Sequence, residues 1–423
     1  MESSISQTGT VSPYSFAGLG EQNFRGTQVT RFMGGLDVYS DSIHVNLNNP
    51  AAYGKLKFTT YSLGINYNTN LLSSGDDNTT LNGASIDYLS IGIPTKRFGF
   101  GFGIIPLTSV GYEIASLEES ENGKFDNQFE GSGGVNQAFF SVGLPIFREF
   151  RIGATGFYNF GSIDYSRSLF IEGVDIASYS KESSKINGWS YQFTSEFDIA
   201  LFEQINLSGL FSFQPQANLN SENLRVYYTR KYDWESYWTN LISENRRVYQ
   251  QEGTVEDFNE FDLGNQNLDK TEKILPQTFK IGIGLGQKQK WFVGTQVNLL
   301  NFDNFKSEFP MRDNVTYQDA RQWIIGGFYI PDYSSLTSYF SRIVYRLGFR
   351  TENLGVLIDG QSLRLNVISF GFGLPVQGLS NANIGLEIGS SGKNQNGLVA
   401  HSSVALRVGL SLNDLWFIKR KYN

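Results

Sequence analysis

The segment Arg97–Pro106 constrains the fold more than any other part of the chain. It reads Arg-Phe-Gly-Phe-Gly-Phe-Gly-Ile-Ile-Pro, so that Phe98, Phe100, Phe102 and Ile104 alternate with glycine. Neighbouring side chains of a strand point to opposite faces, and one face of this strand is therefore apolar and the other bare. A soluble sheet would carry polar residues on its second face. The pattern is typical of a barrel strand that faces lipid outside and is crowded by a plug inside.

The composition is compatible with one large membrane barrel. The chain has 423 residues, of which 15% are aromatic and 45 are glycine. Its mean hydropathy is −0.26. It contains no apolar run of the ~18 residues that a membrane helix requires, which excludes a polytopic helical protein. Barrel strands are not excluded, because their alternating hydrophobicity averages out.

Further segments alternate in the same way. The strand predicted near Phe58–Tyr67 puts aromatic and aliphatic residues on one face. From Trp189 to Phe197, aromatic residues alternate with Ser, Gln, Thr and Glu, and from Val404 to Ser411 aliphatic residues alternate with Ala, Arg, Gly and Ser. The polar parity indicates a wet or polar lumen. The fold class predicted is all-β, a transmembrane antiparallel β-barrel.

The connections between strands are of two kinds. Short joints, several of them marked by proline, recur six times; Ser90–Pro94 running into Arg97–Gly99 is one example. Between them lie long polar stretches, at 118–134, 162–185, 220–273 and 303–316. Short turns on one rim and long loops on the other are typical of outer-membrane barrels, and the count predicts about 14 strands with both termini on the periplasmic side. Residues 56–423 are thus predicted to form the barrel, with long extracellular loops, notably 220–273.

Residues 1–55 are predicted to form an N-terminal hatch or plug. From Gln7 to Lys55 the chain lacks sustained alternation and is rich in small residues and turn formers. A segment of this length without strands is unusual unless it lies inside a lumen that satisfies its backbone. A location in the outer membrane of a Gram-negative cell requires a secretory signal, and none is visible after Met1.

Several chemistries are excluded or disfavoured. The chain has no Cys and two His, His44 and His401, which excludes thiolate chemistry and a His-rich metal site. A net charge of −7 argues against nucleic acid as a partner. No nucleotide or zinc motif is present, and His401 has no partner at a catalytic spacing. The chain is therefore predicted to be no enzyme and to hold no cofactor and no metal.

The chain resembles the FadL-like outer-membrane transport proteins, in the Bacteroidetes-type branch that also includes PorV-like proteins. The resemblance rests on Asn49-Pro50-Ala51, on the Gly-rich strand Phe98–Pro106, on Leu275–Gly282 with Trp291, and on the ending Leu412–Tyr422. It implies a 14-stranded barrel with an N-terminal hatch in the lumen and uptake of hydrophobic compounds. PorV-like members serve type IX secretion instead.

Two sets of site residues are predicted, one in the hatch and one in the barrel wall. Asn49, Pro50 and Ala51 are predicted to anchor the hatch, the alternative being an ordinary Asn-Pro turn. In the family a kink in the third strand makes a lateral opening, and the residues matching that lateral gate are Gly99, Gly101, Gly103 and Pro106. Pro106 could instead mark a bulge or the rim end of its strand.

The third set lies in the longest polar stretch. Aromatic residues are dense there and suit a wet-apolar interface, where they could contact a ligand. They are Tyr227, Tyr228, Tyr232, Trp234, Tyr237 and Trp238. The alternative is a loop that packs on its own aromatic rings.

Three functions remain open. The leading hypothesis is passive uptake of small hydrophobic compounds, fatty-acid-like or aromatic, through the hatch and a lateral opening. The second is a barrel subunit of an envelope complex, such as a type IX secretion translocon, that transports nothing itself. The third is a surface barrel that binds through the aromatic loop. The partners expected are membrane lipid, a hydrophobic small-molecule ligand and an envelope protein.

Overall fold

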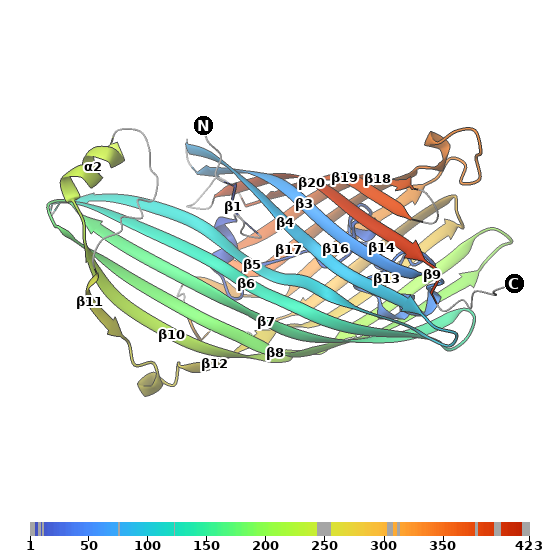
Figure 1. Cartoon of the computed structure of the whole chain (residues 1–423), viewed down its shortest axis with the longest axis horizontal. Coiled ribbons are helices and arrows are strands. Elements are labelled where there is room, and N and C mark those ends of the chain that lie inside the picture. The colour runs from blue at the N-terminus through green and yellow to red at the C-terminus, as the bar shows by residue number, and fades with distance from the viewer. Residues whose placement is uncertain are drawn as a thin grey trace, which may run out of the picture.

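The protein forms a closed antiparallel β-barrel around a hatch (Figure 1). The computed structural model describes residues 5–6, 10, 12–74, 77–121, 123–242, 255–302, 308–310, 314–376, 380–392 and 399–416. The ending that resembles the family therefore lies partly outside the described residues.

The wall contains the 14 predicted strands, which confirms the fold class. Two of them are interrupted, because Pro215 separates β9 from β10 and Pro276 separates β12 from β13, and proline cannot donate to a ladder. The last strand pairs with the first and closes the wall. In order the strands are β3 (Thr59–Ser74), β4 (Asp77–Pro94), β5 (Gly99–Ser120), β6 (Gly123–Pro145), β7 (Phe150–Ile171), β8 (Ile176–Ala200), β9 (Asn206–Gln214) with β10 (Ala217–Lys231), β12 (Lys270–Leu275) with β13 (Gln277–Gln287), β14 (Trp291–Asn301), β16 (Ala320–Tyr329), β17 (Val344–Ile358), β18 (Gln361–Pro375), β19 (Asn381–Ser391) and β20 (Ala400–Asp414).

The alternation places apolar side chains outside. Trp189 and Tyr191 of β8 are 58% and 50% exposed, whereas Ser190 and Gln192 between them are fully buried. An apolar ring on the outer surface is stable only against lipid, so the exposed band marks the membrane-facing surface. No helix among the described residues is long and apolar enough to cross a membrane.

The six short joints are present on one rim, but the opposite rim differs from the prediction. Residues 118–134 and 162–185 were expected to be loops, and this is wrong: β5 and β6 remain paired up to Ser120 and Gly123, and β7 and β8 up to Leu169 and Ser178. A strand that has left the membrane carries polar residues on both faces. Its polarity therefore resembles that of a loop although its hydrogen bonding does not change.

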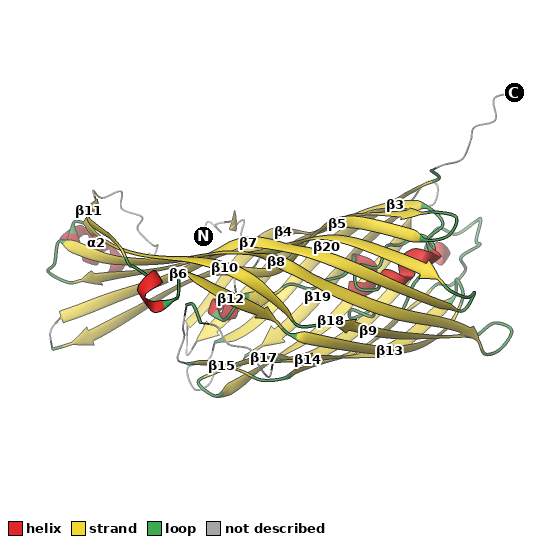
Figure 2. Ribbon diagram, turned by 90° about the horizontal axis from the view of Figure 1, so that it is seen from below, coloured by secondary structure: helices red, strands yellow, loops and turns green. Residues whose placement is uncertain are grey.

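The wall is consequently tall on one side. β5 to β8 have 22 to 25 residues each, whereas β14, β16 and β19 have 10 or 11. The long strands form a sheet that protrudes beyond the barrel, with α2 (Trp234–Ile242) and β11 (Val255–Glu260) at its tip (Figures 1 and 2). The segment 220–273, expected to be one loop, thus contains most of β10, α2, β11, η3 (Gly264–Gln266) and the start of β12.

The N-terminal segment lies in the lumen. It contains β1 (Ile5–Ser6), η1 (Pro13–Phe16), β2 (Glu21–Gln22), α1 (Gln28–Arg31) and η2 (Pro50–Lys55). Phe32, Met33 and Leu36 are fully buried, and Met33 and Leu36 share a cluster with wall residues such as Ile324. The remaining elements are β15 (Val315–Tyr317) near the rim and η4 (Phe340–Arg342) in the longest of the short joints.

Candidate functional site: a split in the barrel wall

The wall splits between β4 and β5. The two strands pair over six register pairs, from Pro94 with Gly99 to Leu89 with Ile104, and beyond Ile104 the described residues show no further pairing between them. β5 nevertheless continues to Ser120 on the side of β6. Within the described residues, the wall thus opens along the seam between β4 and β5.

Pro106 lies at the level of this split. The β5–β6 register shifts between Pro106 and Thr108, which bends the strand. Phe102 and Ile104 face outwards and are 43% and 41% exposed, whereas Ile105 is buried. Beyond this point Thr108 to Gly111 are buried in succession, so both faces of β5 are covered there.

The N-terminal segment fills the split. β2 pairs with β5 through Gln22 and Thr108, and the amide of Asn23 donates to the carbonyl of Leu107 at 2.9 Å. β1 pairs in parallel with β4 through Ile5 and Asn82. Unpaired strand edges are costly in a membrane, and these short strands satisfy part of both edges.

Gly20 allows the close approach of the N-terminal segment to β5. Its φ is +98°, a conformation that side chains rarely adopt, and a Cβ there would overlap the carbonyl of Ser109. The segment is thus shaped to run directly against the wall.

A cavity of about 1390 Å³ lies behind the split. Ile86, Pro106, Leu107 and Phe160 line it on the side of β4 to β7. Charged groups line it elsewhere, including Arg31 of the hatch and several wall residues. Leu354, Leu363 and Val367 of β17 and β18 add an apolar surface on the opposite side, so the lining alternates between apolar and charged areas.

The charged lining is a buried ion-pair cluster that ties the hatch to four strands. Arg31 Nε lies 2.8 Å from Glu387 Oε2, and Arg350 and Arg407 lie 3.3 and 3.4 Å from Glu387 Oε1. Asp87 of β4 lies 3.4 Å from Arg31 and 3.3 Å from Arg407. All five side chains are under 10% exposed, so each charge depends on its partners.

The predicted anchor residues lie where the hatch meets β6 to β8. Asn49 Nδ2 donates to Glu196 Oε2 at 2.6 Å, and Glu196 in turn pairs with Arg151 at 2.8 Å. Pro50 and Ala51 lie against Gly143 and Gly153, where a Cβ would overlap the hatch backbone.

The predicted gate glycines divide into two groups. Gly99 and Gly101 face the hatch, since a Cβ at either position would overlap Tyr53. Gly103 faces the carbonyl of Leu89 and the ring of Phe139 instead, both of which belong to the wall. Only the first two glycines therefore leave room for the hatch.

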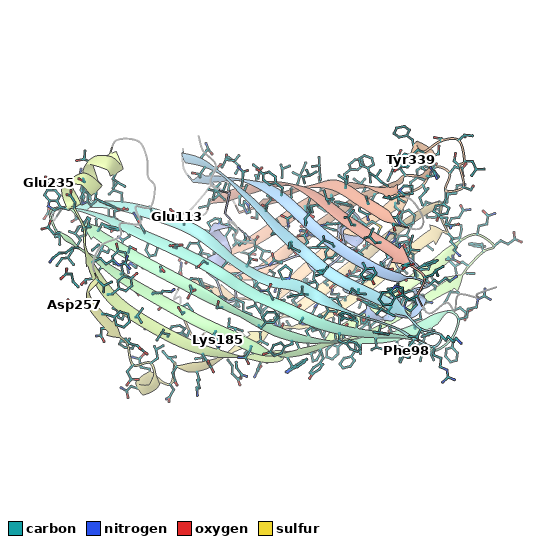
Figure 3. The ribbon with its side chains drawn as sticks, in the orientation of Figure 1. Phe98, Glu113, Lys185, Glu235, Asp257 and Tyr339 are labelled. Atoms are coloured by element: carbon teal, nitrogen blue, oxygen red, sulfur yellow. The ribbon has the colours of Figure 1, made fainter. Side chains whose placement is uncertain are left out.

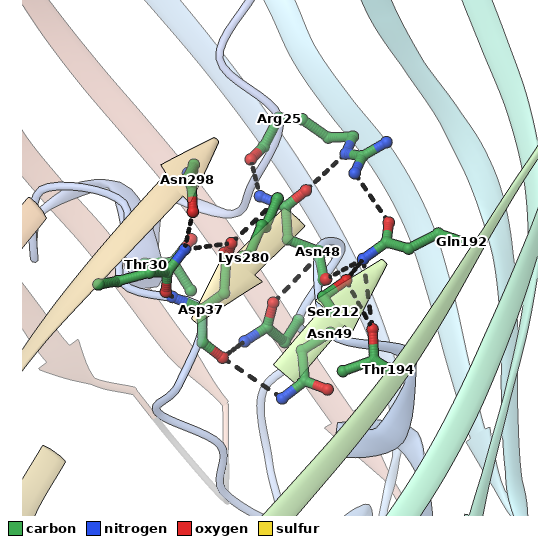
Figure 4. A network of polar contacts seen from close by, with 12 residues as sticks. Arg25, Thr30, Asp37, Asn48, Asn49, Gln192, Thr194, Ser212, Lys280 and Asn298 are labelled. Atoms are coloured by element: carbon green, nitrogen blue, oxygen red, sulfur yellow. Dashed lines mark hydrogen bonds and ion pairs between the residues drawn. The ribbon is translucent and has the colours of Figure 1, made fainter. Parts of the chain in front are cut away.

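A second polar network, not identified from the sequence, holds the middle of the hatch (Figure 4). Arg25 donates to Gln192 Oε1 at 2.8 Å, and Gln192 donates to the carbonyl of Asn48 at 2.5 Å. Asp37 accepts from Lys280 at 3.1 Å. The available signal was the polar parity of β8 and β13, which shows that a residue faces inwards but not what it meets.

The six aromatic residues predicted as ligand contacts lie at the tip of the protruding sheet. Tyr232, Tyr237 and Trp238 are buried in a cluster with Phe170, and the hydroxyl of Tyr237 donates to the buried Asp126. Burial, together with Asp126, raises the pKa of Tyr237. Trp234 packs at the edge of this cluster.

The other two aromatic residues of that set lie on β10. Tyr228 stacks on Tyr179 of β8 with ring centroids 4.9 Å apart. Tyr227 is 43% exposed and meets Phe261 edge-on. The structure thus places most of the set against other aromatic rings.

His401 lies in the cavity wall. Its Nε2 is 2.9 Å from Asn70 Oδ1, and its other nitrogen is 3.5 Å from Ser391 Oγ. Among the described residues, no group of three or more His, Cys, Asp or Glu side chains is arranged to hold a metal ion.

Solved structures share this architecture. The Pseudomonas putida toluene transporter TodX superposes with a TM-score of 0.59 at 15% identity, covering 92% of this chain and 98% of that one. The Ralstonia pickettii toluene transporter TbuX gives 0.57 at 13%, covering 93% and 100%. A Pseudomonas aeruginosa FadL homologue gives 0.55 at 11%, covering 93% and 99%. At these identities the likeness concerns the fold.

The closed 14-stranded barrel with its N-terminal hatch has the fold of the FadL-type barrels. A family model described as BamG matches residues 1–423, and the chain belongs to the BamG family. A sequence search of curated proteins gives no match.

Proposed function

We propose that this barrel passes small hydrophobic molecules through the outer membrane by way of the split between β4 and β5. The single observation that carries the proposal is the end of β4–β5 pairing at Ile104, beside a cavity of about 1390 Å³. A lateral exit suits an apolar solute, because the solute then need not pass the ion-pair cluster that lines the lumen. The solved neighbours named as toluene transporters share the fold and support this choice.

In this proposal the N-terminal segment is the gate. β2 has two register pairs with β5 and β1 has two with β4, so few backbone bonds hold the segment in the split. Each contributes about 0.5–1.5 kcal/mol net, which a fluctuation can overcome. Pro106, with Gly99, Gly101 and Gly103 below it, keeps β5 bent away from β4, and Asn49, Pro50 and Ala51 anchor the hatch while the gate moves.

Uptake measured in cells that lack their own route tests the proposal. The probes are a radiolabelled long-chain fatty acid and toluene, each offered to cells with the intact protein, with Pro106→Ala or with an empty vector. The intact protein should raise uptake of at least one probe above the vector, and Pro106→Ala should lower it at equal barrel abundance. Uptake equal to the vector for both probes contradicts the proposal.

A second candidate is a barrel subunit of an envelope complex that transports nothing. The observation favouring it is the protruding sheet of β5 to β8 and β10, which extends beyond the membrane-facing barrel (Figure 2). Purification in mild detergent distinguishes the candidates. One stoichiometric partner together with vector-level uptake would favour the second, and a solitary barrel with uptake would favour the first.

A further inference from the structure

β11 is the outer edge of the protruding sheet. It pairs with β10 from Glu260 opposite Val226 to Val255 opposite Arg230, and no other described strand pairs with it. All six of its residues are exposed. An edge strand presents a row of backbone donors and acceptors that can pair with another chain.

The side chains of β11 make this edge acidic. Val255–Glu260 contains Glu256, Asp257 and Glu260 and no Lys or Arg. Lys231 lies 3.3 Å from Glu256, and the described residues show no ion pair to Asp257 or Glu260. The edge therefore disfavours an acidic strand and favours a basic one, because like charges on neighbouring strands are destabilising and opposite charges are stabilising.

β11 also carries the last ring of a row of aromatic side chains that crosses the sheet. Tyr179, Tyr228 and Phe258 lie in register across β8, β10 and β11. The guanidinium of Arg230 lies 5.7 and 5.2 Å from the rings of Tyr179 and Tyr228. Phe258 is 66% exposed, so the last ring of the row has an open face for another cation.

We propose that β11 binds an extended, arginine-rich segment of a partner protein by strand addition. Backbone pairing along β11 supplies affinity, as it does when peptides add a strand to a sheet. Arginines of the segment pair with Glu256, Asp257 and Glu260, and one of them covers Phe258. The inference goes beyond the proposed uptake and does not depend on it.

The location makes the edge accessible from outside the membrane. Asp257 lies at the end of the molecule opposite Phe98 and Tyr339, which mark the rim of short turns (Figure 3). Charge alone would protect an edge from aggregation. The exposed Phe258 and Val255 add apolar contact surface that protection does not require.

The test uses the full-length protein in detergent micelles and two fluorescent peptides of about ten residues, long enough to pair with the whole strand. One alternates Arg with Val. The other replaces each Val by Pro, so it keeps the charge but cannot form a ladder. Fluorescence anisotropy should give at least about tenfold tighter binding for the Arg-Val peptide, and its affinity should fall with salt.

Variants locate the binding. E256K/D257K/E260K should weaken the Arg-Val peptide at least about tenfold, whereas the matched reversal E118K/E119K/E121K, at the β5–β6 tip, should leave it within about twofold. Should the first variant fail to fold, Phe258→Ser serves in its place and should weaken binding without changing charge. Equal affinity for both peptides, absence of binding, or equal loss with both reversals overturns the proposal.

Discussion

The two sides of the barrel wall differ in what their strands contact. On the short side, β17, β19 and β20 carry Arg350, Glu387 and Arg407 into the lumen, where they meet Arg31 of the hatch. On the tall side, β5 to β8 extend past the hatch, and α2 packs against Phe170 of β7 and Ala177 of β8. The same antiparallel strand pairing thus encloses a plug in one place and builds an exposed sheet in another. The interactions that stabilise the whole barrel should therefore lie at the hatch, and a substitution at the tip should destabilise only the tip.

The largest effect is expected at the ion-pair cluster. Glu387→Ala leaves Arg31 and Arg407 with Asp87 and leaves Arg350 with Glu352 at 3.9 Å, and it should destabilise the hatch by about 3–5 kcal/mol. The barrel should lose its resistance to SDS at a clearly lower temperature, which gel mobility after heating measures. Glu118→Ala at the exposed tip is the control and should change the transition little. Equal thermal transitions for both variants would contradict the proposed difference in stability between the hatch and the tip.

A smaller effect is expected where the hatch touches β7. In Gly153→Ala the added Cβ meets the backbone at Pro50 and Ala51, and such overpacking should cost about 1–3 kcal/mol. Gly156 is the matched position on the same strand, because a Cβ there has its nearest neighbour at 3.9 Å, in Tyr191. Gly156→Ala should leave the thermal transition unchanged. Should both variants behave alike, close packing of the hatch against β7 is not what holds it.

The smallest and most local effect is expected at the tip. Tyr237→Phe removes the donor to Asp126 and should cost about 1–3 kcal/mol locally, since the buried carboxylate loses a partner. Amide exchange should accelerate in α2 while the barrel strands keep their protection. Accelerated exchange throughout the barrel would show that tip and barrel form one cooperative unit.

The tip should also respond to alkaline pH. The pKa of Tyr237 is raised in the folded protein, so its contribution is complete below the ordinary tyrosine pKa of about 10 and is lost as pH rises beyond it. Exchange in α2 corrected for its intrinsic pH dependence should be flat from pH 7 to 9 and rise above pH 10, and Tyr237→Phe should abolish the rise. A rise that persists in Tyr237→Phe would have another origin.

The wall could be predicted from sequence because its signal is local. Alternation from Trp189 to Phe197 identifies both faces of a strand, and six short joints determine the strand number. The tall sheet was missed because residues such as Glu113 and Glu118 lie in strands outside the membrane, where alternation of polarity ends but pairing continues.

The site could be predicted only in part. Pro106 and the glycines below it are visible in the sequence, but the end of β4–β5 pairing is not, since both strands continue past it. Arg31 and Glu387 are 356 positions apart, and no sequence pattern around either residue indicates that the two pair. Contacts between hatch and wall depend on how the closed barrel places its lumen-facing side chains, and no local pattern contains that information.

The gate can be tested most directly by fixing β2 to β5. Gln22 and Thr108 are register partners, at a Cα separation of about 4.5–5.5 Å that suits a disulfide. Ser62 and Ser411, register partners in the closed β3–β20 seam, provide the control pair. With Q22C/T108C, oxidation should reduce uptake of the transported probe to the vector level and reduction should restore it, while S62C/S411C transports in both states. Undiminished uptake by fully oxidised Q22C/T108C would contradict a passage through the split.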